Sequence, residues 1–192
     1  MAESGDGSGG DGTQRVEYVE SLLRSDEMNE QTRGLELAGE GDALPPDRLT
    51  DLVPALAECA ADSNHYVKGR ASTVLQDLVS AHPERIAPAV VDVLETLPFD
   101  DDTVAPVIGS LQKEVQDSPD VASTLEVDAA TSLLSSDCRE AQDVGFTLLG
   151  SSTDPHAVDE LAKWTDVGGP RVERAAQGEL ERLVEQSIER LA

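Results

Sequence analysis

The sequence predicts an all-α protein of about ten helices, arranged as five antiparallel hairpins. Apolar residues recur with the three- and four-residue spacing of a helix along almost the whole chain. No stretch keeps the strict alternation that is typical of a half-buried strand. The breaks between apolar segments are short and contain Gly, Pro, Ser or Asp, as antiparallel neighbours require. A chain of 192 residues is long enough for one domain or a short repeat array.

The clearest hairpin lies within residues 49–79. Its first helix carries one apolar stripe, formed by Leu49, Leu52, Val53, Leu56, Ala57 and Ala60. Its second helix carries another, formed by Val67, Ala71, Val74, Leu75, Leu78 and Val79. Between them, Asp62-Ser63-Asn64 favours a turn and a helix N-cap.

The same reading divides the rest of the chain. Residues 1–12 are rich in Gly and acidic residues and are expected to form a disordered tail, without the basic start and apolar run of a signal peptide. A repeat domain is expected over residues 13–192, and no segment in it is apolar enough to span a membrane. The approximate repeats are 13–39, 46–81, 83–117, 119–150 and 154–192.

A repeat of about 35 residues connects these hairpins. Aligning the second helices places a small residue at the crowded point of each, at steps of 37, 70 and 35 residues: Gly34, Ala71, Ala141 and Ala176. First helices repeat too, because Leu-Val-Pro-Ala-Leu at 52–56 and Ile-Ala-Pro-Ala-Val at 86–90 are 34 residues apart. Prolines at equivalent places predict a repeated bend.

Residues 49–79 resemble a HEAT or armadillo-type repeat. The matching features are an apolar helix with a Pro, an Asp at the turn, then Val, a basic residue, Ala and Leu on the second helix. Residues 137–149 and 170–183 are similar to further second helices, and the resemblance covers about residues 13–192. It implies a right-handed α-α superhelix, or solenoid, of about five hairpins whose concave face binds other proteins. It implies no reaction.

The charge is strongly acidic. There are 39 acidic and 14 basic residues, a formal net charge of −25, and 11 of the basic residues are Arg. This excludes a basic nucleic-acid binder or a cationic membrane-surface protein. The acids are spread along the chain, which favours a halophilic, cytoplasmic protein over an acidic protein that binds a basic partner in ordinary salt. Two isolated cysteines, Cys59 and Cys138, also fit a reducing cytoplasm.

Candidate partner-binding residues lie near the starts of the second helices. The basic ones are Arg33, Lys68, Arg70, Arg139, Arg171 and Arg174. They could form a track for carboxylates or phosphates, or each could pair with a turn aspartate: Asp26 with Arg33, Asp62 with Arg70, Asp166 with Arg174. The second reading is favoured. Tyr66 and Trp164 are expected to be interhelix packing or partner anchors.

The ends of the stack are expected to differ. A terminal repeat must cover its outer face, and the charged side of the last helix, which includes Glu179 and Arg182, could do so. At the first pair, Met28, Leu35 and Leu37 could instead leave an apolar patch for a partner.

No catalytic or cofactor motif is present. The three His are expected at helix starts without metal spacing, and Asp100-Asp101-Asp102 is expected to begin a helix rather than bind a cation. We therefore expect a noncatalytic protein-binding scaffold without a cofactor, with a protein partner, no membrane and an unlikely nucleic-acid partner. The alternatives are an enzyme or accessory subunit of lyase type with HEAT-like repeats, and a nucleic-acid-associated protein.

Overall fold

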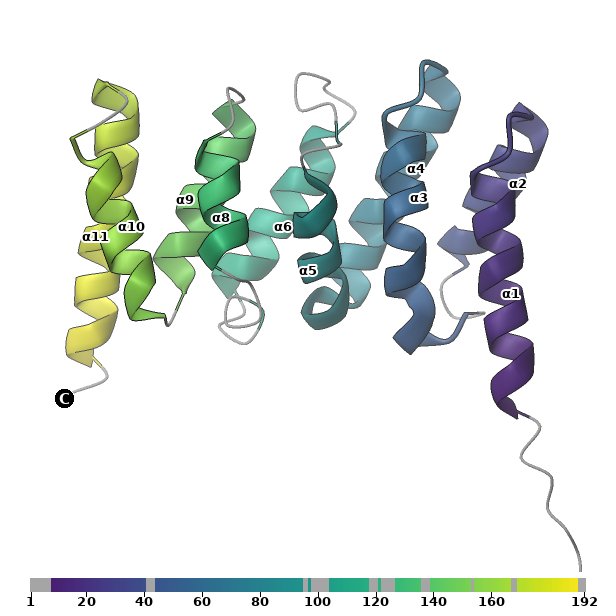
Figure 1. Cartoon of the computed structure of the whole chain (residues 1–192), viewed down its shortest axis with the longest axis horizontal. Coiled ribbons are helices and arrows are strands. Elements are labelled where there is room, and N and C mark those ends of the chain that lie inside the picture. Colours follow the sequence, from purple (N-terminus) through teal and green to yellow (C-terminus); the bar gives the residue numbers. More distant parts are fainter. Residues whose placement is uncertain are drawn as a thin grey trace, which may run out of the picture. The chain divides into compact units, whose positions relative to one another are not determined.

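The computed structural model describes residues 8–40, 44–94, 97, 104–117, 121, 127–135, 139–152, 154–166 and 169–189. Every regular element within these ranges is a helix, and none of these residues lies in a strand, which confirms the all-α prediction (Figure 1). None of the helices in these ranges is both long enough and apolar enough to cross a membrane. The chain divides into two compact units, residues 1–107 (unit 1) and 108–192 (unit 2).

Among the described residues, unit 1 contains two packed helix pairs, a 3-10 helix between them and one further α-helix. Its elements are α1 (Ser8–Leu23), α2 (Met28–Gly39), the 3-10 helix η2 (Pro46–Leu52), α3 (Val53–Ala60), α4 (His65–Ala81) and α5 (Pro83–Val93). Helix α1 packs on α2 and α3 packs on α4. The two second helices, α2 and α4, also pack on each other, and α5 packs against α3 and α4 (Figure 1).

The crowded point of the first pair is Gly34. A Cβ atom at this position would lie 2.9 Å from the backbone nitrogen of Leu23 and 3.1 Å from the side chain of Leu22. Glycine therefore lets α1 and α2 approach closely. The prediction that a small residue is needed here is confirmed.

The N-terminal helix starts earlier than expected. Helix α1 begins at Ser8, so the prediction of a disordered tail over residues 1–12 is wrong for Ser8–Gly12; residues 1–7 lie outside the described ranges. A tertiary contact explains part of the difference. The Pro45 ring packs so close to Gly12 that a Cβ atom there would lie 2.6 Å from the proline Cγ.

The two repeated prolines occupy different places. The stripe from Leu49 to Ala60 is not one helix, because the 3-10 helix η2 precedes α3 and Pro54 falls in the first turn of α3. A first turn accepts proline without losing a hydrogen bond. Pro88, by contrast, lies inside α5. The expectation of the same internal bend at both prolines is therefore wrong at Pro54.

Unit 2 repeats the paired arrangement. The helix α6 (Ala105–Asp117) spans the division between the units, and unit 2 continues with α8 (Val127–Leu134), α9 (Arg139–Ser151), α10 (Pro155–Trp164) and α11 (Pro170–Glu189). Helix α8 packs on α9, α10 packs on α11, and the second helices α9 and α11 pack on each other (Figure 1). The expected third hairpin, 83–117, is thus divided between the units.

The α8–α9 pair is most crowded at Gly145, one turn after the position that the sequence repeat suggests. A Cβ atom at Gly145 would lie 2.8 Å from the carbonyl oxygen of Ala130 and 3.0 Å from the Leu134 side chain. Ala141, the predicted position, is fully buried but has room for its methyl group. Counted from the starts of α2 and α9, Gly34 and Gly145 are both the seventh residue, so the two pairs place this close approach at the same register.

Candidate functional site

The second helices of unit 2 run in the same direction. Arg171, at the start of α11, contacts residues in the first turns of α9, whereas Arg182, further along α11, contacts Ser151 at the end of α9. Because the start of α11 lies beside the start of α9, and a later turn of α11 lies beside the end of α9, the two helices are parallel neighbours. The predicted basic residues Arg139, Arg171 and Arg174 therefore lie along one edge of this unit.

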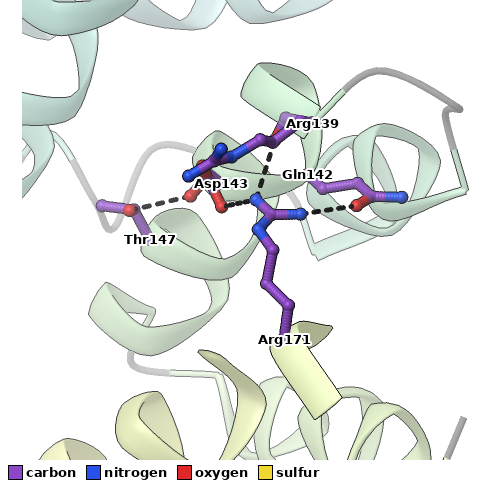
Figure 2. A network of polar contacts seen from close by, with 5 residues as sticks. All are labelled: Arg139, Gln142, Asp143, Thr147 and Arg171. Atoms are coloured by element: carbon purple, nitrogen blue, oxygen red, sulfur yellow. Dashed lines mark hydrogen bonds and ion pairs between the residues drawn. The ribbon is translucent and has the colours of Figure 1, made fainter. Parts of the chain in front are cut away.

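One carboxylate serves two guanidinium groups at this edge (Figure 2). Nη2 of Arg171 donates a hydrogen bond to Oδ1 of Asp143 and a longer one, 3.4 Å, to the carbonyl oxygen of Arg139. Nη1 of Arg171 lies 3.4 Å from Oε1 of Gln142. The second oxygen of Asp143, Oδ2, lies 3.7 Å from Nε of Arg139. The three charged side chains together carry a net charge of +1.

The two arginines differ in how fully they are engaged. The side chain of Arg139 is 71% exposed and its 3.7 Å contact with Asp143 is too long for a hydrogen bond, whereas that of Arg171 is 38% exposed and held by three acceptors. Arg174, one turn after Arg171, is exposed, and its Nε donates to the carbonyl oxygen of Pro170 at 2.8 Å.

The three named pairs of a basic residue with a turn aspartate do not form in the structure. None of the three predicted pairs occurs among the ion pairs of the described residues. Asp62 instead accepts the backbone N–H of Asn64 at 2.7 Å, and Arg174 bonds to its own helix. The carboxylate that engages Arg171 comes from the second turn of a neighbouring second helix, and a spacing rule within one hairpin does not reveal that partner.

In unit 1 the corresponding edge is more aromatic. The guanidinium of Arg33 lies 6.0 Å from the centre of the Tyr18 ring, close enough for a cation–π interaction. Lys68 is half-buried and Arg70 is exposed, both in the first two turns of α4. The aromatic partner Tyr18 lies on a first helix, and sequence reasoning did not assign it to the site.

Exposed apolar side chains gather where α2 and α4 begin. Tyr66 is 59% exposed and Met28 is 51% exposed. The side-chain amide of Asn64, the N-cap of α4, donates to the sulfur of Met28 at 3.1 Å, so the two helix starts lie next to each other. We call Met28 and Tyr66 the unit 1 anchor surface.

Trp164 has a packing role. Its ring meets Phe146 edge-on, with centroids 6.4 Å apart and an interplanar angle of 89°. This is a favourable geometry for two buried or half-buried rings. Of the two aromatic candidates from the sequence, Tyr66 is therefore open to a partner and Trp164 holds α10 against α9.

A second polar contact joins α9 and α11 near the end of α9. Arg182 donates to the Ser151 hydroxyl at 2.7 Å, and its Nε lies 2.8 Å from Oε2 of Glu179. The Glu179 carboxylate presses against Gly150, where a Cβ atom would overlap it. Burial raises the pKa of Glu179, and Arg182 opposes that rise. Of the charged residues expected on the outer face of the last helix, Glu179 and Arg182 therefore face α9 instead.

The exposed apolar side chains of the first helix pair and of α11 also differ from expectation. Leu35 is fully buried and Leu37 is half-buried, so the predicted patch at the first pair is wrong except for Met28. On α11, Val184 and Ile188 are 58% and 61% exposed. They are one turn apart and lie on the same side of the helix.

The other residues considered for chemistry have structural surroundings. Cys59 is buried, its thiol lies 3.3 Å from the Leu23 carbonyl oxygen, and burial raises its pKa to about 11, so it is a poor nucleophile. His65 and His156 are exposed in the first turns of their helices, and His82 precedes α5, as predicted. Cys138 and the Asp100–Asp102 run lie outside the described residues.

Comparison with known proteins gives no family for this chain. No protein-family model matches the sequence. No curated protein matches it either. Its function is therefore inferred from its own residues.

Proposed function

We propose that the protein is a noncatalytic protein-binding scaffold whose HEAT-like hairpins form a right-handed α-α superhelix. In this proposal the second helices line the concave face and bind the partner. One observation carries it most strongly: in both units the second helices pack side by side, and Met28, Tyr66 and Arg139 near their starts are more than half exposed.

The side chains at these starts are of the types that stabilise protein interfaces. Tyr, Met and Arg are enriched in interface cores, and a few such anchors supply most of the binding energy. The unit 1 anchor surface presents a Tyr and a Met, because Tyr66 and Met28 are both more than half exposed. A partner that covers them gains apolar burial without displacing any part of the described core.

The proposal extends to a salt-rich cytoplasm. A net charge of −25 repels itself at low ionic strength, whereas the Debye length falls to about 3 Å in 1 M salt. The polar contacts described above are consistent with such a solvent, because Arg171, Arg182 and Asp143 make them at short range. High salt then screens repulsion between surface carboxylates while leaving apolar anchors effective.

The test is affinity purification from a native high-salt lysate followed by mass spectrometry. The double variant Tyr66→Ala/Met28→Ala should reduce recovery of the main partner by about tenfold or more, the effect of losing roughly 1.4 kcal/mol of binding. Val158→Ala is the matched control, since it also removes an exposed apolar side chain but lies on a first helix. It should leave recovery unchanged.

Three results would count against the proposal. The first is that no protein is recovered, and the second is that the double variant and Val158→Ala recover equal amounts. The third is a stoichiometric cofactor or chromophore that copurifies, which would favour the enzymatic alternative. Far-UV circular dichroism confirms beforehand that each variant is folded.

A further inference from the structure

We infer that the edge formed by Arg139 and Arg171, at the starts of α9 and α11, binds the carboxylate of an acidic residue on a partner protein. This inference rests on the proposed function and identifies the chemistry that unit 2 contributes to it. Recognition of a charged group here differs from the apolar contact at the unit 1 anchor surface, so the two surfaces would bind different side chains of the partner.

The charge balance of the edge provides the first argument. Asp143 is the only carboxylate among the described residues that contacts either guanidinium, so two positive charges share one negative charge. A carboxylate from the partner would balance the second positive charge and would alternate with Arg139, Asp143 and Arg171. This excess is a local one, because the whole chain carries a net charge of −25.

The geometry provides the second argument. Asp143 holds the Arg171 guanidinium between α9 and α11, so this group is positioned before any ligand arrives (Figure 2). Arg139 is 71% exposed and makes no hydrogen bond from its guanidinium to the other described residues. Its planar fork of donors matches the two oxygens of a carboxylate. An incoming carboxylate can thus bond to Arg139 without breaking the contact between Arg171 and Asp143.

A partner carboxylate fits better than a nucleic-acid phosphate. Duplex DNA brings about one negative charge per 1.7 Å of its axis, and a chain of charge −25 repels such a polyanion over a long distance. The cluster of Arg139, Asp143 and Arg171 offers one excess positive charge, which is enough for a single carboxylate but not for a row of phosphates. Salt weakens binding of either ligand, but the loss grows with the number of phosphates that are neutralised, so a polyanion loses more affinity in high salt than a single carboxylate does.

The test is an NMR titration of the full chain in 1 M KCl, which follows the Nε–Hε signals of its arginines. The probe is a peptide with blocked ends that carries two Glu residues among Gly and Ala, and its counterpart carries two Gln residues. We expect the Glu peptide to shift the Arg139 and Arg171 signals and the Gln peptide to leave them in place. Arg139→Gln should weaken binding of the Glu peptide at least fivefold.

Lys163→Gln is the matched control. It removes one exposed positive charge from the same unit, but Lys163 pairs with Glu160 on its own helix. It should change the dissociation constant by less than twofold. An oligothymidylate, titrated at 0.1 M and 1 M KCl, is the nucleic-acid arm and should not shift these signals at either salt concentration.

The inference is overturned if the Glu peptide shifts no signal at this edge, if both variants weaken binding equally, or if the oligothymidylate competes with the peptide. These outcomes are separate from failure of the proposed function. A partner captured through Tyr66 and Met28, without any response to Arg139→Gln, overturns the carboxylate site alone. Binding of the Glu peptide without any captured partner overturns the scaffold proposal instead.

Discussion

The two pairs of second helices are held together by different chemistry. In unit 1, Gly39 of α2 packs against Val74 of α4, and the Asn64 amide donates to the sulfur of Met28, so no charged group takes part in these contacts. Arg33 of α2 lies over the Tyr18 ring of α1 rather than beside a carboxylate. In unit 2, polar contacts join α9 and α11 at both ends, through Arg171 with Asp143 and through Arg182 with Ser151. The same periodic pattern of apolar residues underlies both pairs.

This difference shows that the repeated apolar stripe determines that neighbouring helices pack, but not what stabilises their polar edges. The stripe supplies most of the burial energy in both units. The contacts of the arginines near the helix starts then depend on the adjoining side chains, which are an aromatic ring for Arg33 and a carboxylate for Arg171. The two units should therefore respond alike to packing changes and differently to pH and salt.

The largest expected effect comes from adding a methyl group at the two closest helix approaches. Gly34→Ala in unit 1 and Gly145→Ala in unit 2 should each lower the free energy of unfolding by about 1–3 kcal/mol. In both cases the new Cβ atom meets backbone atoms, Leu23 N or Ala130 O, which cannot move aside as a side chain can. Urea unfolding followed by circular dichroism measures the change.

Two helix-interior glycines with open space provide controls. Gly69→Ala in α4 and Gly178→Ala in α11 have no neighbour within 4 Å of the new Cβ atom. Because alanine favours a helix over glycine, each should raise the free energy of unfolding by up to about 1 kcal/mol. If all four variants change stability in the same direction, the close approaches at Gly34 and Gly145 are not real constraints.

A smaller effect, confined to unit 2, concerns Glu179 and pH. Its pKa is raised in the folded state, so the folded protein holds this proton at pH values where the unfolded chain has lost it. The free energy of unfolding must then fall as pH rises from the ordinary carboxyl range through the raised pKa, and stay low above it. Because the Glu179→Gln side chain does not ionise, its free energy of unfolding should not fall in this way, and the variant should be more stable than the wild type at neutral pH.

Thermal melting of the wild type and Glu179→Gln across pH 4–8 in 1 M KCl measures this effect. The difference between the two proteins should grow with pH and then become constant. Identical pH profiles would show that burial of Glu179 against Gly150 does not disfavour the charged carboxylate. Gly150→Ala provides an independent check, because its methyl group would displace Glu179 and should destabilise unit 2.

The smallest expected effect compares the two arginine contacts directly. A double-mutant cycle on Arg171 and Asp143 should give a coupling energy of about 0.2–1 kcal/mol, since both side chains are more than one-third exposed. Salt screening should reduce it in 1 M KCl. A cycle on Arg33 and Tyr18 should give about 0.5–1 kcal/mol. A coupling at Arg171 that does not change with salt would contradict the ion-pair description.

Several features of the fold could be predicted because they depend on neighbours in the sequence. The stripe on α4, its Asn64 cap and the need for a small residue at Gly34 follow from spacing and side-chain type. The break before α3 was missed, since a stripe from Leu49 to Ala60 does not distinguish a 3-10 turn from an α-helix. The N-terminal boundary was missed because Gly12 packs against Pro45, 33 positions later in the chain.

The candidate site was predicted in part, by residue type rather than by contact. The sequence placed basic residues at the starts of the second helices, and α9 and α11 bring Arg139, Arg171 and Arg174 to one edge. It did not predict Asp143 as their shared partner or Tyr18 as the partner of Arg33. Both contacts, Arg171 with Asp143 and Arg33 with Tyr18, join two different helices. Their partners are too far apart in the sequence for a local spacing rule to identify them.

The sequence alone therefore determined that this chain folds into paired helices with acidic surfaces and Arg at the starts of its second helices. Periodicity and capping are local properties, and burial of a stripe depends on little else. Only the tertiary structure decided which charges are neutralised, that Leu35 is core while Val184 and Ile188 are exposed, and that Glu179 faces α9. Those outcomes depend on which helix packs beside which, and on the register at which they meet.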